Sequence, residues 1–223
     1  MGKEKKKVLP SYNLVLEKQI DVLKAYATYC EEYEKPVNYK KIANLTDIHH
    51  TQVSGCRKFW ESIGFLKRKG RAKDIPTEKL EKFVSKLSWG EEQEAFEFLG
   101  RHLNDEWFVK HTFTQLKLGK KDQEALINSL GKTIGLTSKK KKKVKSIRML
   151  VDLMEKCNLI EKDEDGMFTI SSGVRERTQF EVLPEEEMVI IVIEGEKYAI
   201  PSEDLKEFVK EEGSKLSKKE HHL

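Results

Sequence analysis

Apolar residues recur at helical spacing through most of the first 160 residues. In the stretch 14–33, Leu16, Ile20, Leu23 and Ala27 fall on one face, and this spacing predicts an amphipathic helix. Glu34-Lys35-Pro36 ends it, because proline disfavours helix in the residue before it. The same spacing predicts further helices at about 50–63, 78–87 and 91–103, and a long helix that ends near Asn158. Two more helices begin after residues that suit an N-cap: one after Asn38, and one at 123–133 after Asp122.

Short strand pairs follow two of these helices. Phe65-Leu66 and 71–75 flank the turn Lys69-Gly70, and Leu159-Ile160 and 167–170 flank a turn at 163–166. The aromatic stretch 107–118 fits either a strand or a short helix. A third strand pair is predicted at 188–193 and 197–200, followed by a helix at 203–212. The fold class is therefore α+β and mostly helical.

The helix, turn, helix and hairpin pattern occurs twice. Glu61-Ser62-Ile63-Gly64-Phe65-Leu66 aligns with Glu155-Lys156-Cys157-Asn158-Leu159-Ile160. The second copy is longer between its turn and its strand, and the extra residues coincide with Ser138 and a run of lysines. We interpret that run as an inserted turn, because a block of like charges opposes helix formation.

Charge is segregated along the chain. The formal net charge is only +4, from 42 Lys and Arg against 38 Asp and Glu. Lys and Arg nevertheless dominate 57–73 and 139–148, whereas acidic residues dominate 181–213. Two basic zones indicate a polyanionic partner, and the acidic zone indicates a separate role.

Several classes of site find no support in the sequence. The three cysteines lack metal-ligand spacing, and the adjacent His49-His50 would point about 100° apart on a helix, so we expect no metal. Gly131-Lys132-Thr133 lacks the rest of a phosphate-binding loop, and the sequence contains no recognisable catalytic triad. We therefore expect neither a bound cofactor nor enzymatic activity. A signal peptide and membrane spans are also missing from the pattern, so the expected location is the cytoplasm.

The stretch 38–75 resembles the winged helix-turn-helix family. The resemblance rests on Lys41-Ile42-Ala43, the run from Ile48 to Ser54 and Glu61 to Leu66, and extends less closely to 91–171. The chain looks like archaeal proteins with tandem winged helices. This resemblance implies binding of double-stranded DNA and transcription regulation.

In such a unit the start of the third helix enters the major groove and a basic hairpin, the wing, lies beside it. Gln pairs with adenine edges, whereas lysine and arginine suit phosphates. We read the lysine run either as an electrostatic arm of the second copy or as a solvated loop, and the second hairpin is acidic and would repel phosphate. The expected DNA contacts are His50, Thr51, Gln52, Ser54, Arg57 and Lys58 of the helix, Lys67, Arg68, Lys69, Arg71 and Lys73 of the wing, and Lys139, Lys140, Lys141, Lys142, Lys143, Lys145 and Arg148.

The alternative function is a protein-interaction adaptor, because tandem winged helices also occur in ESCRT-II subunits and condensin accessory subunits. The acidic module would then be a docking surface or a homodimer contact through 181–213, and otherwise it is a solubilising cap. The predicted organisation is a disordered basic tail (1–13), two winged helix-turn-helix domains (14–88 and 89–173), an acidic ββα module (174–213) and a frayed tail (214–223).

Overall fold

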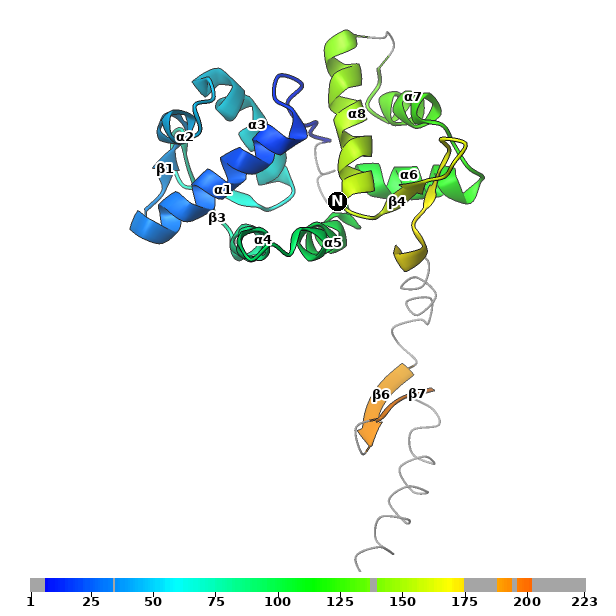
Figure 1. The fold of residues 1–223 in the computed structure, drawn as a ribbon. Helices are drawn as coiled ribbons and strands as arrows, with labels where there is room; N and C mark the ends of the chain where they lie inside the picture. Colours follow the sequence, from blue (N-terminus) through cyan, green and yellow to red (C-terminus); the bar gives the residue numbers. More distant parts are fainter. Residues whose placement is uncertain (1–6, 34, 137–139, 175–187, 194–195, 202–223) are drawn as a thin grey trace, which may run out of the picture. The chain divides into compact units, whose positions relative to one another are not determined.

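The computed structural model describes residues 7–33, 35–136, 140–174, 188–193 and 196–201. The fold is α+β and mostly helical, with small antiparallel sheets (Figure 1). The chain divides into two compact units, 1–171 and 172–223. Within the described residues, none of the helices is both long enough and apolar enough to cross a bilayer.

The first half of the larger unit holds four helices and a three-stranded sheet. The sheet has the order β1-β3-β2, with Val37 paired to Asp74 and Leu66 paired to Pro76. Helix α1 contacts α2, α3, α4 and the sheet. The bounds are α1 Leu16–Tyr33, β1 Val37–Asn38, α2 Tyr39–Thr46, α3 His50–Ser62, β2 Leu66–Arg68, β3 Lys73–Pro76 and α4 Glu78–Ser88.

The second half repeats this order. The undecided stretch 107–118 is helical, and Lys121 forms a bridge with Phe168 that stands where β1 stands in the first half. Helix α6 therefore corresponds to α1, and α5 follows α4, on which it packs (Figure 1). The bounds are α5 Glu92–Leu103, α6 Trp107–Lys117, α7 Gln123–Thr133, α8 Lys141–Lys156, β4 Ile160–Lys162 and β5 Phe168–Ile170.

Local signals place the starts of α2 and α7 where the sequence predicts them. The side chain of Asn38 accepts a hydrogen bond from the Lys40 backbone N–H, and that of Asp122 accepts one from Ala125. Both caps are confirmed. Each satisfies a backbone donor that the first turn of a helix leaves without a partner.

The two halves make matching backbone hydrogen bonds. After the second helix of each pair, Phe65 donates to Trp60 (2.9 Å) and Leu159 donates to Met154 (2.9 Å). The residue before each donor, Gly64 or Asn158, has a positive φ (80° and 54°). The hairpin turns also match, because Lys69 donates to Lys73 and Asp163 donates to Met167, both at 3.0 Å. The repeat predicted from six residues thus extends to backbone geometry.

The insertion in the second copy is not all loop. Helix α7 has 11 residues against 8 in α2, and α8 has 16 against 13 in α3. Lys141, Lys142 and Lys143 form the first turn of α8, so the interpretation of the whole lysine run as an inserted turn is wrong. The apolar face of α8, which includes the buried Ile147, Leu150 and Met154, outweighs the repulsion among these exposed lysines.

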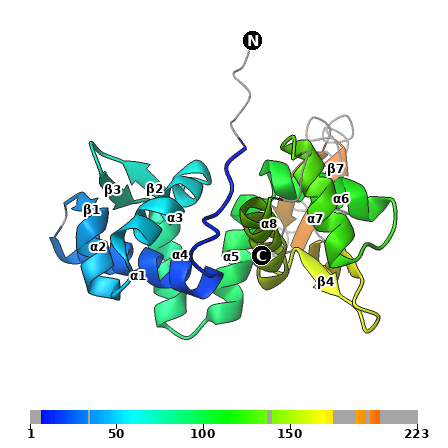
Figure 2. The same cartoon turned by 90° about the horizontal axis from the view of Figure 1, so that it is seen from above.

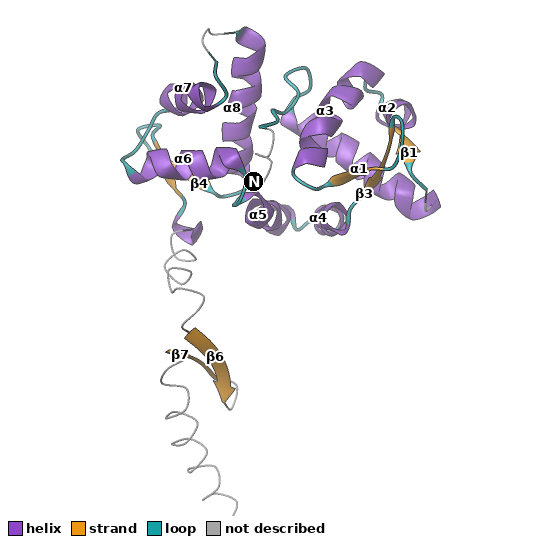
Figure 3. Ribbon diagram, turned by 180° about the vertical axis from the view of Figure 1, so that it is seen from behind, coloured by secondary structure: helices purple, strands orange, loops and turns teal. Residues whose placement is uncertain are grey.

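The two halves share a core. A row of rings runs from Trp60 through Phe65 and Phe83 to Phe96, with centroids 5.9, 5.8 and 5.5 Å apart. A second ring contact, 6.3 Å between Phe59 and Phe108, joins α3 to α6. Figure 3 shows the helices of this unit from behind. Burial of such rings contributes strongly to the stability of a core of this size.

Gln19 is a buried polar residue that also joins the two halves. The side chain is fully buried; it accepts a hydrogen bond from Trp60 Nε1 (3.0 Å) and donates from Nε2 to the Leu14 carbonyl (2.8 Å). Its Nε2 also lies 2.9 Å from Met149 Sδ of α8. One satisfied amide therefore connects α1, α3 and α8.

In the smaller unit, β6 (Met188–Ile193) and β7 (Glu196–Pro201) form an antiparallel hairpin, as predicted. The predicted helix at 203–212 and the tail 214–223 lie outside the described residues. Most of the acidic stretch before β6 lies outside them as well.

Candidate nucleic-acid interface

The start of α3 presents polar side chains at the surface. His49 is the N-cap, and its Nδ1 lies 2.8 Å from the Thr51 hydroxyl. His50 and Thr51 are exposed, and Gln52 and Ser54 are half-buried. Further along the same helix, Lys58 is exposed. These positions remain compatible with the predicted contact to base edges.

Arg57 does not belong to this surface. It is 7 % exposed, and its guanidinium forms two hydrogen bonds to Asp74 of β3, which is 1 % exposed. Burial alone would lower the pKa of Arg57, but the hydrogen bonds and charge of Asp74 raise it, so Arg57 keeps its positive charge. The prediction that Arg57 contacts DNA is therefore corrected: its charge is already used inside the protein.

Two tyrosines complete the surroundings of this ion pair. Tyr26 donates a hydrogen bond to Asp74 (3.1 Å), and burial raises the pKa of the Tyr26 phenol, which keeps it a donor. The ring of Tyr39 lies 5.1 Å from the Arg57 guanidinium. The pair joins α3 to β3 and so fixes the hairpin relative to the helix.

The hairpin β2–β3 carries the densest exposed positive charge beside α3. Its turn is closed by the hydrogen bond from Lys69 to Lys73, with positive φ at Gly70 (143°) and Ala72 (60°). Strand β2 contacts α3, which places the hairpin next to that helix. All five predicted wing contacts are exposed: Lys67, Arg68, Lys69, Arg71 and Lys73.

The predicted basic residues of the second copy lie on α8. Lys140 is the N-cap and makes no side-chain cap hydrogen bond, and no acidic residue occupies the first turn. Lys139 lies outside the described residues. The remaining predicted contacts are exposed: Lys140, Lys141, Lys142, Lys143, Lys145 and Arg148.

The N-terminal residues 7–14 pack between α3 and α8 (Figures 1 and 2). The Asn13 carbonyl accepts a hydrogen bond from Gln52 of α3 (2.8 Å), and the Pro10 carbonyl accepts one from Ser146 of α8 (2.6 Å). The prediction of a disordered tail over 1–13 is therefore wrong for residues 7–13. Nothing in the local sequence revealed these contacts, although Val8-Leu9-Pro10 is an apolar run inside the basic stretch.

This segment also brings the two helix starts together. Lys142 Nζ lies 5.3 Å from the ring centroid of Tyr12, and hydrogen bonding to Lys142 lowers the pKa of the Tyr12 phenol. Tyr12 is next to Asn13, which holds Gln52. The first turns of α3 and α8 are thus bridged by two residues, and their cations and polar groups lie on one connected surface.

The second hairpin, β4–β5, has the opposite character to the first. Glu161, Glu164 and Asp165 are exposed, and Asp163 forms an ion pair with Lys120 (2.6 Å). Phosphate groups would be repelled here. The candidate interface therefore extends to the basic residues of α8 but not to the hairpin β4–β5.

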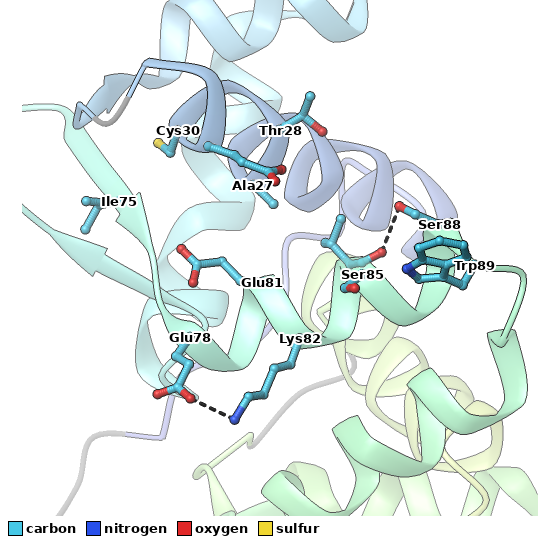
Figure 4. Close-up of a pocket in the computed structure, with 12 residues that line it drawn as sticks. Ala27, Thr28, Cys30, Ile75, Glu78, Glu81, Lys82, Ser85, Ser88 and Trp89 are labelled. Atoms are coloured by element: carbon cyan, nitrogen blue, oxygen red, sulfur yellow. Dashed lines mark hydrogen bonds and ion pairs between the residues drawn. The ribbon is translucent and has the colours of Figure 1, made fainter.

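An open groove of about 1030 Å³ lies between α1, β3 and α4 (Figure 4). Ala27, Cys30 and Val84 form its apolar floor, and Trp89 stands at one end with 81 % of its surface exposed. Its charged lining residues are Glu31, Glu78, Glu81 and Lys82, and Lys82 is paired with Glu78 (2.7 Å).

This acidic groove shares no residue with the predicted DNA contacts. Its carboxylates would oppose a phosphate backbone, so a polyanion is expected only at the basic surface of α3, β2–β3 and α8. Comparisons of the chain with protein-family models, with curated proteins and with solved structures found no match.

Proposed function

We propose that residues 14–171 form two winged helix-turn-helix domains that share a core, and that the chain binds duplex DNA as a regulator of transcription. The helix order, the matching turns, and the pairing of β1 with the first hairpin and of the single bridge at Lys121 with the second support the domain assignment. The observation that carries the function is the exposed basic hairpin β2–β3 beside the exposed polar start of α3. The ion pair of Arg57 and Asp74 acts within this interface by fixing the hairpin on the helix.

The lysines at the start of α8 extend the same surface. A major groove repeats along one side of B-DNA only every 34–36 Å, about one helical turn. Gln19 accepts a hydrogen bond from Trp60 of α3 and lies 2.9 Å from Met149 of α8, so the two helices are held in one core and cannot enter successive major grooves as the two halves of a dimer do. In this proposal α3 reads bases, and α8 contacts the adjacent phosphates.

A charge-matched pair of variants tests the proposal. In the first, Lys67, Arg68, Lys69 and Arg71 become Ser; in the second, the exposed Lys18, Lys24, Lys79 and Lys82 become Ser. Binding to a fluorescent duplex is titrated at several salt concentrations. Each lost phosphate contact flattens the slope of log K against log salt by about 0.9, so the hairpin variant is expected to show a flatter slope and weaker binding.

The control variant has the same net charge and should bind like the parent protein. No binding by the parent at low salt would reject the function. Equal losses in the two variants would reject the interface, because they would reflect net charge alone.

The acidic groove and the acidic second hairpin favour a second candidate, an adaptor that binds a protein partner. The large exposed indole of Trp89 beside carboxylates is a feature that DNA binding does not use. The adaptor function would be preferred if the parent protein failed to retain DNA at low salt and Trp89→Ala abolished capture of a partner.

A further inference from the structure

The segment 7–14, here called the N-terminal strap, is held by contacts on both of its sides. Toward α3 it offers the Asn13 carbonyl to Gln52, and toward α8 it offers the Pro10 carbonyl to Ser146. Lys7 Nζ donates to the Thr133 carbonyl at the end of α7 (3.0 Å). The strap is therefore docked on the surface that the proposed function assigns to DNA.

Its position on α3 coincides with the outward face of the helix. Thr51, Gly55 and Lys58 form an exposed stripe at helical spacing. At Gly55, a β-carbon would lie 3.1 Å from the Ser11 hydroxyl oxygen and 3.8 Å from the Ser11 β-carbon. Ser11 of the strap thus lies against the stripe at Gly55, where the absence of a β-carbon permits this close approach.

The width of the DNA major groove determines whether this contact affects DNA binding. The major groove is about 12 Å wide, and a helix with its side chains is about 10–12 Å across. A single helix fills the groove, so α3 and a strap lying against its outward face do not fit together. DNA and the strap must exclude each other on α3.

The strap is held less deeply than the residue that follows it, although its Ser11 carbonyl also accepts a hydrogen bond from Gln19 (3.2 Å). Its apolar anchors are the buried Pro10 and the half-buried Val8 and Leu9, whereas Leu14, at its end, is 6 % exposed. Leu14 is further secured by the hydrogen bond from Gln19 to its carbonyl. Residues 7–13 can leave while the chain from Leu14 onward stays in the core, so release requires a local opening only.

We infer that the N-terminal strap is an autoinhibitory element that competes with DNA for α3. The inference rests on the proposed DNA binding. In this arrangement the apparent affinity for DNA equals the intrinsic affinity multiplied by the fraction of molecules whose strap is released. Whatever holds or frees the strap sets the occupancy of the DNA site.

A reversible disulfide tests this directly. The 3.8 Å between the β-carbons at positions 11 and 55 equals the mean separation across disulfides, so Ser11→Cys with Gly55→Cys should cross-link the docked strap. The native thiols compete poorly, since burial raises the pKa of Cys30 to about 11 and that of Cys56 to about 12. DNA binding is measured on one preparation, first oxidised and then reduced.

The oxidised protein is expected to bind a fluorescent duplex at least about tenfold more weakly, because the disulfide leaves no molecules whose strap is released. Reduction should restore binding. Ser11→Cys alone is the control and should not respond to reductant. Failure of the disulfide to form, or equal binding in both redox states, would overturn the strap mechanism. Loss of binding in the reduced and the parent proteins alike would instead reject the proposed function on which it rests.

A second variant tests the strap without a cross-link that could distort α3. Ser146→Ala lies in α8 and removes the hydrogen bond to Pro10 without changing charge. It should release the strap more often and tighten DNA binding severalfold, the opposite direction to the lock. Unchanged or weaker binding by Ser146→Ala would contradict autoinhibition.

Discussion

At the scale of single residues, one buried ion pair distinguishes the two copies. Arg57 of α3 pairs with Asp74 of β3 in the first copy. The equivalent residues in the second copy are Val151 and Phe168, which are 0 % and 1 % exposed. The same backbone thus accommodates either an ion pair or two apolar side chains, so the pair is not required by the fold itself.

The energetics of this site can be tested by removing its members separately or together. Asp74→Ala should lower the free energy of unfolding by about 3–5 kcal/mol, because it leaves the Arg57 charge buried without its partner. Replacing all the polar members at once (Arg57→Met, Asp74→Leu, Tyr26→Phe) should cost less than this single change. Urea denaturation measures both, and a triple variant less stable than Asp74→Ala would contradict the argument.

Thr112 of α6 provides a prediction of the opposite sign. Its hydroxyl is fully buried and has no hydrogen-bond partner among the described residues. Thr112→Val keeps the shape and removes the unsatisfied group, so the free energy of unfolding should rise by about 1 kcal/mol. Thr46→Val is the matched control: its hydroxyl donates to the Ile42 carbonyl (2.9 Å), so that variant should gain nothing.

At the scale of elements, the distance over which a signal acts determines what the sequence could predict. The sequence predicts the Asn38 and Asp122 caps and the hairpin turns, because these features depend on neighbours within a few residues. The burial of Arg57 depends on Asp74, which comes from a different element, and its charge alone indicated a surface position. The docking of Pro10 depends on Ser146, far away in sequence, and no local pattern reports such a contact.

Helix α8 illustrates an element whose start is poorly suited to stability. Lys140 gives no side-chain cap, and three lysines follow in the first turn, where the helix dipole disfavours positive charge. Lys140→Ser should therefore raise the free energy of unfolding by about 1 kcal/mol. The same change should weaken DNA binding and flatten its salt slope by about 0.9 if Lys140 contacts a phosphate.

The control for this prediction is the start of the preceding helix. Asp122 already caps α7 by accepting from Ala125 (2.7 Å), so Asp122→Ala should cost about what Lys140→Ser gains. Thermal unfolding measures both. If Lys140→Ser gave no gain while Asp122→Ala lost stability, the start of α8 would not be limited by its cap.

At the scale of the whole unit, the two copies have no separate cores. The rings of Phe59 and Phe108 and the buried amide of Gln19 cross from one copy to the other. The row from Trp60 to Phe96 continues through α4 into α5. Separating the two copies would expose these side chains to water, so each copy stabilises the other.

This coupling predicts that the copies unfold together. Asp74→Ala lies in the first copy and Thr112→Val in the second, yet each should shift one common unfolding transition. Hydrogen exchange at equilibrium distinguishes the cases, because amides of α2 and α7 report on different copies. Asp74→Ala should lower protection in α7 by the same free energy as in α2, and Thr112→Val should raise both. If either change affected only its own copy, the shared rings and Gln19 would be contacts between independent domains, and α3 would be free to approach DNA without moving α8.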